Sequence, residues 1–279
     1  MFQPAPVISR LAEDNVSWRT GLNWTVAPGS LLYASVSKGY KDGDYPTAGA
    51  TASPGLAPAK QEALLAYELG FKLSLADHTL QLNGATFYYA YTDKQVRGRI
   101  IDPIFGSFNR LINIPRSHET GAELEVKWRP VNGLTLSAGG TYLNSRIDGN
   151  FVNLDALGAV RNLTGEPYSY TPTWSGIAGI DYRHSVGTGL IGFATADVNY
   201  QSSSYAGLGE VPLFELNARA LLNLRAGVES SSGNWNVALW ADNVTNKYYW
   251  NNVLSVTGDD VIRYAGMPVT MGISVGWKF

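Results

Sequence analysis

The 279-residue chain has no cysteine, only three histidines and no long apolar run. The lack of cysteine excludes disulfides and thiolate metal sites. His78, His118 and His184 have no second histidine at ligand spacing, so we predict no metal site and no cofactor. No segment reaches the roughly 18 apolar residues that a spanning helix requires. A formal net charge of −2 gives no electrostatic case for a nucleic-acid partner.

Charged residues are also scarce, at 16% of the chain, against roughly 25% in an ordinary soluble domain. Glycine and aromatic residues are abundant instead, with 30 Gly, 16 Tyr and 8 Trp. A transmembrane β-barrel has such an averaged composition, because apolar outward and polar inward side chains alternate along each strand. The first six residues lack a basic segment followed by an apolar core, so we predict no secretory signal in the chain.

Strict alternation of apolar with small or polar residues marks the strands. It is clearest over residues 269–279, where alternate positions place one apolar set on a single face. That set includes Met271, Ile273, Val275, Trp277 and Phe279. The same pattern recurs over 62–73, 122–129 and 214–229, and less cleanly near 16–26, 31–38, 79–96, 134–146, 173–184, 190–201 and 235–244. We predict about eleven strands; the facing of 79–96 is ambiguous, because its leucines and its aromatic residues fall on opposite parities.

The connections between these strands alternate in length. The short ones are 27–30, 76–78, 130–133, 186–189 and 230–234, and the long ones are 39–59, 98–117, 147–172, 202–213 and 245–267. In an antiparallel up-and-down meander, alternate connections lie at opposite ends, so we predict one short-turn end and one long-loop end. This asymmetry is typical of outer-membrane barrels.

Four tryptophans lie on the apolar parity near a short turn or the end of the chain: Trp24, Trp128, Trp235 and Trp277. We predict that they form an aromatic ring at one lipid–water interface; the alternative is that they fill the core of a soluble fold. Single-chain bacterial barrels normally have an even number of strands. An odd count therefore predicts that residues 1–279 are the C-terminal part of a larger barrel, unless a further strand lies within residues 1–15.

Six segments resemble, in order, the C-terminal half of TonB-dependent outer-membrane receptors: 32–40, 67–72, 121–125, 223–225, 241–248 and 277–279. The resemblance implies a 22-stranded barrel in the outer membrane of a Gram-negative bacterium, of which eleven strands would be half. It also implies an N-terminal plug and energy from the inner-membrane TonB complex. We expect neither the plug nor the TonB-contacting segment within residues 1–279. The imported substrate would be a scarce nutrient, most often a ferric siderophore.

Two sets of candidate functional residues follow. The lumen- and plug-facing set comprises Glu68, Glu123, Glu125, Arg219 and Arg225, and the alternative for each is general lumen polarity. The ligand-binding set lies on the long loops, because binding residues concentrate on loops held by a rigid scaffold. It comprises Tyr40, Tyr45, Arg97, Arg99, Arg110, Tyr168, Tyr170, Tyr205, Tyr249 and Trp250. Their aromatic faces and cations suit a bulky anionic chelate; the alternative is that they are ordinary loop and interface residues.

The terminal strand has a further interpretation. The resemblance implies that its alternating residues are an assembly signal for the barrel assembly machinery, although the same alternation is also needed to close the barrel. Two other classes of function remain open, a passive porin or substrate-specific channel and an outer-membrane enzyme. We predict no enzyme and no catalytic residues, because no nucleophile and base can be paired from the sequence.

Overall fold

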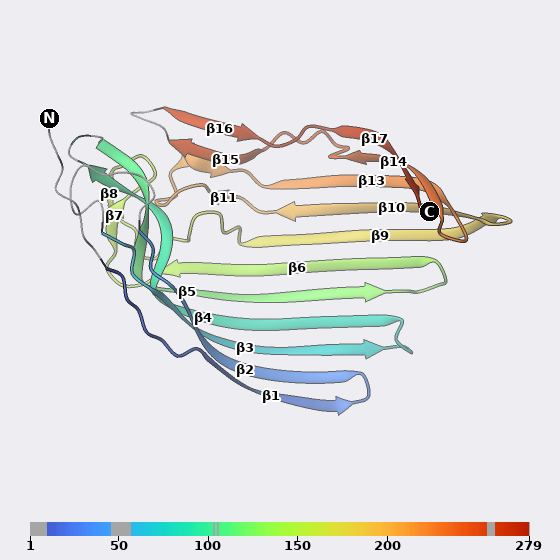
Figure 1. Ribbon diagram of the computed structural model, residues 1–279, viewed down its shortest axis with the longest axis horizontal. Helices are drawn as coiled ribbons and strands as arrows, with labels where there is room; N and C mark the ends of the chain where they lie inside the picture. The colour runs from blue at the N-terminus through green and yellow to red at the C-terminus, as the bar shows by residue number, and fades with distance from the viewer. Residues whose placement is uncertain (1–9, 46–56, 103, 105, 256–259, 279) are drawn as a thin grey trace.

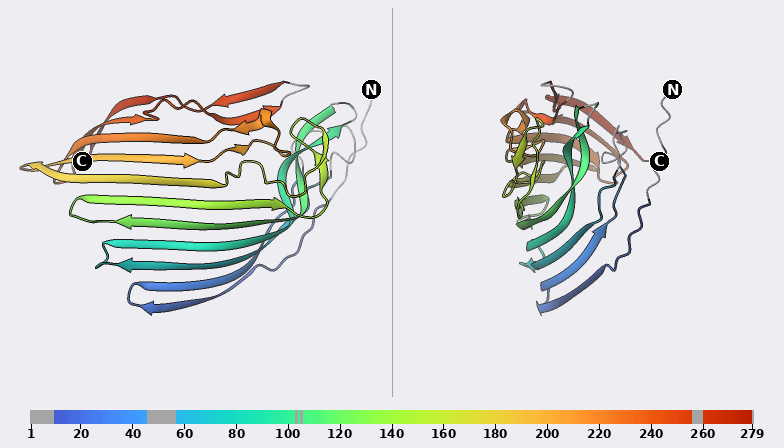
Figure 2. Two further views of the ribbon diagram at one scale, coloured as in Figure 1. Left: turned by 180° about the vertical axis from the view of Figure 1, so that it is seen from behind. Right: turned by 90° about the vertical axis from the view of Figure 1, so that its left-hand side faces the viewer.

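The computed structural model describes residues 10–45, 57–102, 104, 106–255 and 260–278. They form one curved antiparallel sheet of eleven strands, with the long connections gathered at one end (Figures 1 and 2). In sheet order the strands are β1 (Trp18–Ala27), β2 (Ser30–Lys41), β3 (Glu62–Leu75), β4 (Leu80–Asp102), β5 (Gly106–Trp128), β6 (Leu134–Ile147), β9 (Trp174–Gly187), β10 (Leu190–Gln201), β13 (Arg219–Ser230), β14 (Trp235–Asp242) and β17 (Thr270–Trp277).

Short elements occupy the long connections. They are β7 (Val152–Leu154), β8 (Val160–Asn162), β11 (Ser204–Tyr205), the 3₁₀ helix η1 (Pro212–Phe214), β12 (Glu215–Leu216), β15 (Trp250–Ser255) and β16 (Val261–Ala265). The predicted all-β, up-and-down architecture of eleven strands is confirmed, and the sheet stays open between its edge strands β1 and β17. Among the described residues, no helix is long and apolar enough to span a bilayer.

The strand register defines two faces. One cross-strand row aligns Leu22, Ala34, Leu69, Thr86 and Ala122, and we call the face that carries this row the outer face. The neighbouring row carries Ser35, Glu68, Phe87 and Gly121 on the inner face. In a barrel the apolar face meets lipid and the polar face lines the lumen.

The register also settles the facing of strand β4. Leu80 and Leu82 align with the outer-face residues Trp128 and Val126 of β5. Phe87 lies on the inner face, where its ring stacks on that of Tyr89 at 4.6 Å between centroids. The leucines and the aromatic residues of this strand therefore fall on opposite parities because the large aromatic side chains lie on the inner face.

Several inner-face aromatic rings lie over a glycine on the neighbouring strand. Tyr33 lies over Gly70, Phe87 over Gly121, Phe193 over Gly227 and Trp240 over Gly272, each glycine being the direct cross-strand partner. A methyl group added at Gly272 would lie 2.6 Å from Trp240 Cζ2. These glycines are therefore required for space rather than for backbone flexibility.

The structure corrects two predicted boundaries. The interval 98–117 is not a loop, because β4 continues to Asp102 and β5 begins at Gly106. The predicted strand 79–96 passes the irregularity at Asp93, whose φ is 51°, but stops short of the end of β4 at Asp102. The predicted strand 214–229 is also too long, because β13 begins at Arg219. Phe214 and Leu216 instead turn into a buried cluster among the loops.

All four predicted interface tryptophans lie near the short-turn end of the sheet, on the outer face. Trp24, Trp128 and Trp277 are 60%, 44% and 64% exposed. Trp235 is the direct partner of Trp277 across β14 and β17. An indole at this depth can keep its ring in lipid and its N–H in the polar interface.

Candidate ligand-binding site

Three long connections and the loop-end extension of β4 and β5 fold into one structure, which we call the cap. Its described residues are 93–102, 106–115, 147–172, 202–218, 243–255 and 260–268. The paired extension of β4 and β5 continues to Asp102 and Gly106 and curls over the loop end of the sheet (Figure 1). The pairs β7–β8, β11–β12 and β15–β16 lie beside it. Segments that are far apart in sequence are therefore held together above the inner face.

Two apolar clusters hold the cap together. The first contains Ile114, Ile147, Phe151, Leu163, Tyr168 and Leu208. The second contains Ala156, Val211, Phe214, Leu216 and Val253. Ile114 and Leu163 are 0% exposed and Val253 is 1% exposed. Since these side chains are buried within the protein itself, the cap has a fixed shape on which a binding surface can be built.

Two residues predicted to bind ligand lie inside this structure. Arg99 is 5% exposed; its Nη1 donates to Ala156 O at 2.7 Å and its Nε to Ser107 Oγ at 2.8 Å. It therefore fastens the β4–β5 extension to the connection after β7. Tyr168 is 5% exposed within the first cluster, and its burial raises the pKa of its hydroxyl. We therefore leave Arg99 and Tyr168 out of the proposed ligand surface.

Four further predicted residues lie at other places on the rim. Arg110 donates through Nη2 to Ala57 O, and burial lowers the pKa of its guanidinium. Tyr40 lies near the end of β2 on the outer face, with Lys38 Nζ 5.5 Å from its ring centroid. Tyr45 follows Asp44 on the β2–β3 connection, and Tyr205 lies in β11, where its carbonyl accepts from Tyr170 N at 2.8 Å.

The remaining four predicted residues belong to one chain of contacts across the cap. Arg97 is exposed and lines a small hollow with Tyr170. The pKa of the Tyr170 hydroxyl is raised by burial, an effect that Arg97 opposes. This hydroxyl donates to Asn252 Oδ1 on β15, and Tyr170 itself has a φ of 60°. A left-handed tyrosine is uncommon, and such strained residues cluster at functional sites.

The second half of this contact chain begins on the inner face of β13. Arg219 Nη1 donates to Trp250 O at 3.2 Å, and its guanidinium lies 4.6 Å from the Tyr249 ring centroid. The Trp250 ring has Arg263 5.6 Å from its centroid and meets Tyr248 edge-on at 5.0 Å. Because Trp250 and Asn252 are both on β15, the two halves form one group. We call it the mouth cluster: Arg97, Tyr170, Arg219, Tyr248, Tyr249, Trp250, Asn252 and Arg263.

The chemistry of the mouth cluster suits a bulky organic anion. Guanidinium groups form charge-assisted hydrogen bonds with anionic oxygens, and aromatic faces pack against organic rings and cations. The sequence did not identify Tyr248, Asn252 and Arg263 as site residues. Their signal was their position in the long connection 245–267, next to Tyr249 and Trp250, and Tyr248 also ends the segment 241–248 that carried the resemblance.

The five predicted lumen residues all fall on the inner face. Glu68 is paired with Ser35, Glu123 with Ala85, and Glu125 with Asn83. Glu123, Glu125 and Arg219 line a hollow of about 440 Å³ together with Gly139. Arg225 Nη2 donates to Ser274 Oγ at 3.3 Å. These charges therefore lie on the face that lines the water-filled lumen in a barrel.

A separate hydrogen-bond network locks the cap to the wall of strands. Asn243 is 4% exposed with a φ of 49°. Its Nδ2 donates to the carbonyls of Lys247 and Met267, both at 3.0 Å, and its Oδ1 accepts from Lys247 N at 2.8 Å. Asn243 N in turn donates to Asn223 Oδ1 at 3.0 Å. Two of the sequence segments that carried the resemblance thus meet at this residue.

The terminal strand presents its apolar set on the outer face. Met271, Ile273, Val275 and Trp277 are 73%, 69%, 72% and 64% exposed, and each pairs with an outer-face residue of β14. Phe279 lies outside the described residues. The strand therefore offers alternate apolar side chains together with one edge of the sheet.

Comparison with known proteins gave matches of three kinds. Residues 5–244 match the family described as TonB dependent receptor-like, beta-barrel. The pesticin receptor of Yersinia pestis is 33% identical over 136 residues, which cover 48% of this chain and 19% of the receptor. The crystal structure of the ferric yersiniabactin uptake receptor FyuA from Yersinia pestis matches with a TM-score of 0.74 and 21% identity, covering 92% of this chain and 36% of that one.

A second solved structure, the siderophore receptor PiuA from Acinetobacter baumannii, matches with a TM-score of 0.66 and 18% identity. The match covers 93% of this chain and 35% of that protein. At these identities the structural matches establish the fold. The chain spans well under half the length of each of these relatives.

Proposed function

The chain belongs to the TonB-dependent receptor β-barrel family, and from that premise we propose that it forms the loop-bearing barrel wall of a receptor that imports a ferric siderophore. Barrels of this family lie in the outer membrane of Gram-negative bacteria, so the chain is an outer-membrane protein. The proposal rests on the mouth cluster, which brings guanidinium groups and aromatic rings together at the loop end of the sheet. The matches also disfavour the passive-channel alternative, because the relatives are uptake receptors.

Within the complete receptor, we assign three roles to this chain. The mouth cluster binds the ferric chelate at the loop end. The inner-face charges contact the plug or its waters, and transport uses energy from the TonB complex. The alternating residues Met271, Ile273, Val275, Trp277 and Phe279 serve as the signal to the barrel assembly machinery, which suits recognition by strand addition. We propose no catalytic step.

Siderophore binding by the complete receptor tests the role of the mouth cluster. The double variant Arg219→Ala/Tyr249→Ala removes a cation and the aromatic ring beneath it. We expect it to weaken binding of a ferric siderophore about tenfold or more, because truncating central aromatic and arginine contacts costs about 2 kcal/mol. The measurement is quenching of tryptophan fluorescence on titration with the ferric chelate.

The matched control is Arg225→Ala, which removes another inner-face arginine, bonded to Ser274 in the wall and not part of the mouth cluster. Unchanged affinity in Arg219→Ala/Tyr249→Ala, or equal loss in the control, would contradict the assignment. Binding of a desferri-siderophore with the same affinity would show that the chelated iron is not recognised.

A further inference from the structure

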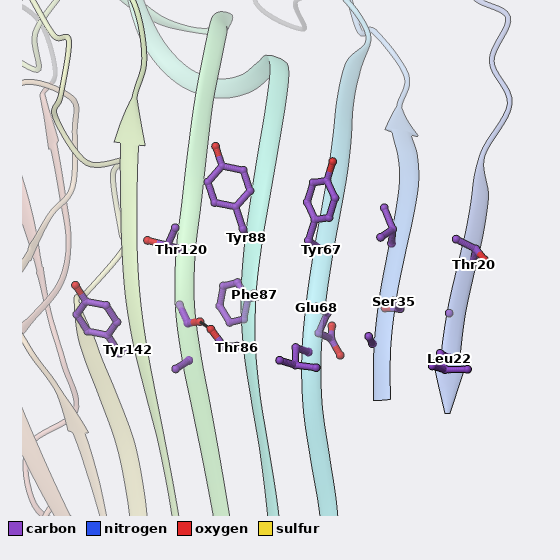
Figure 3. Close-up of a pocket in the computed structure, with 16 residues that line it drawn as sticks. Thr20, Leu22, Ser35, Tyr67, Glu68, Thr86, Phe87, Tyr88, Thr120 and Tyr142 are labelled. Atoms are coloured by element: carbon purple, nitrogen blue, oxygen red, sulfur yellow. Dashed lines mark hydrogen bonds between the residues drawn. The ribbon is translucent and has the colours of Figure 1, made fainter. Parts of the chain in front are cut away.

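The inner face of β4 carries a column of aromatic side chains that leads toward the cap. Phe87 and Tyr88 lie on opposite faces of the strand (Figure 3), with Phe87 on the inner face. Tyr89 and Tyr91 follow Phe87 at alternate positions, so they share that face. The column therefore ends at Tyr91, two residues before β4 enters the cap at Asp93.

Lys94 lies over the end of this column because the strand is irregular at Asp93. Residues three apart in a regular strand face opposite sides of the sheet. Asp93 has a φ of 51°, and its carbonyl accepts a hydrogen bond from Asn113 Nδ2 at 2.6 Å. The Lys94 ammonium is thereby brought to 3.4 Å from the centroid of the Tyr91 ring. A positive φ is uncommon outside glycine, and here it turns a lysine toward the inner side of the strand.

The Lys94 ammonium has two further partners, one in the wall of strands and one in the cap. It lies 3.5 Å from Glu119 Oε1 of β5 and 4.8 Å from the centroid of the Tyr168 ring. The side chains of Lys94 and Glu119 are 15% and 14% exposed. A cation that is largely withdrawn from water needs such partners, and its attraction to an aromatic face grows as water is excluded. Lys94 therefore joins β4, β5 and the connection 147–172.

Tyr168 begins a turn, residues 168–171, that holds Tyr170 in its strained conformation. Tyr168 N donates to Ser145 Oγ of β6 at 3.1 Å. Thr171 Oγ1 donates to Tyr168 O at 2.6 Å and lies 3.1 Å from the same Ser145 Oγ. Tyr170, between them, has a φ of 60°. The position of the Tyr170 ring therefore depends on how firmly Tyr168 is held.

We propose that Lys94 is a positioning residue of the mouth cluster. Through the Tyr168 ring it fixes the turn that carries Tyr170, and through β4 it fixes Arg97, three residues further along the extension. Arg97 and Tyr170 line one small hollow, so a shift of either segment would separate a cation from the aromatic ring beside it. This role rests on the proposed function, because the mouth cluster is the surface assigned to the ferric siderophore.

Fluorine NMR of the complete receptor without ligand tests the positioning directly. A 3-fluorotyrosine placed at residue 170 should give one sharp resonance in the unmodified receptor. Lys94→Met removes the ammonium and should split or broaden that resonance. Lys94→Arg should restore a single line, because a guanidinium can also lie over a ring and pair with a carboxylate. The matched control Lys38→Met removes a lysine that lies 5.5 Å from the Tyr40 ring on the outer face, and it should leave the resonance unchanged.

Siderophore binding is the second measurement. Lys94→Met should weaken binding about five- to tenfold, because only the fraction of receptor with both groups in place is competent to bind. If Lys94→Met fails to assemble, Glu119→Gln keeps the lysine, removes its ion pair and should weaken binding by a smaller factor. In a Tyr168→Leu background, which has no ring for the ammonium to contact, Lys94→Met should cause at most about a twofold further loss.

An unchanged fluorine spectrum in Lys94→Met would overturn the proposal, as would equal effects in Lys38→Met or a full additional loss in the Tyr168→Leu background. Normal binding by Lys94→Met, while Arg219→Ala/Tyr249→Ala binds weakly, would also overturn it. Failure of the proposed function has a different signature. Arg219→Ala/Tyr249→Ala would then bind the siderophore normally, while the fluorine resonance of residue 170 would still depend on Lys94.

Discussion

Large apolar side chains behave in opposite ways in the wall of strands and in the cap. In the wall, Leu239 and Ile273 are direct neighbours on the outer face and remain 61% and 69% exposed. In the cap, Ile114 and Leu163 are fully buried. The wall therefore depends on lipid to cover its apolar residues, whereas the cap covers its own in water. One chain thus contains a membrane-type sheet without a core and a soluble-type core built from its loops.

Truncating a side chain in the cap core should show most clearly that the cap can lose stability while the wall does not. Leu163→Ala should destabilise the cap by about 2–5 kcal/mol, the usual cost of a buried leucine truncation. Hydrogen exchange of the complete receptor should then show faster exchange in residues 147–172 and unchanged protection in the wall strands. The control Val160→Ala truncates a residue that is 69% exposed in the same connection. Loss of protection throughout the wall would mean that the cap and the wall are one cooperative unit.

Placing a charge on each face of one strand tests which face of the wall meets lipid and which faces the lumen. Ile180 and Ile177 of β9 are 44% and 50% exposed, but Ile180 pairs with Leu136 on the outer face and Ile177 pairs with Gly139 on the inner face. Ile180→Arg should cost about 2–4 kcal/mol of unfolding free energy in lipid vesicles, because it puts a cation near mid-depth in the bilayer. Ile177→Arg should cost much less, since it faces the lumen. If both variants cost the same, the assignment of the faces is wrong.

Truncating the side chain that joins the cap to the wall, Asn243, should cost less stability than the changes within either region. Asn243→Ala leaves the Lys247 N–H and the carbonyls of Lys247 and Met267 without their amide partner. We expect a loss of about 1–3 kcal/mol, the cost of leaving buried polar groups unpaired. Proteolysis should detect it first as cleavage within residues 243–268. Asn246→Ala, which removes only the bond from Val269 N, is the milder comparison.

Alkaline pH should loosen the cap slightly and selectively. Burial raises the pKa of Tyr168 in the folded cap above its value in the unfolded chain. Stability from this group is therefore complete below the unfolded pKa of about 10 and falls as pH rises above it, by up to about 1.4 kcal/mol per pH unit. Tyr168→Phe should remove this part of the pH dependence, as measured by exchange in the cap corrected for the intrinsic rate. An identical pH profile in both proteins would show that Tyr168 does not control the opening.

The two regions also differed in how far the sequence could predict them. Wall strands were found because alternation and tight turns are local signals, as in β17 and the turn before β2. The facing of β4 was ambiguous because Phe87 and Tyr89 put apolar rings on the wet face. The cap depends on contacts between distant residues, such as Arg99 with Ala156. Local patterns therefore identified Arg97, Tyr170, Tyr249 and Trp250 as candidates without showing that β15 brings them together, or that Arg99 and Tyr168 are buried.

The rings that lie over glycines on the inner face have a consequence for how far side chains project from the wall. Each glycine removes the side chain that would otherwise push its neighbour's ring inward, as at Gly272 beneath Trp240. The aromatic surface is thereby kept close to the backbone, and the inner face of the wall stays shallow. Glycine thus sets how closely these rings lie against the wall, and a Gly272→Ala substitution would push the Trp240 ring away from it.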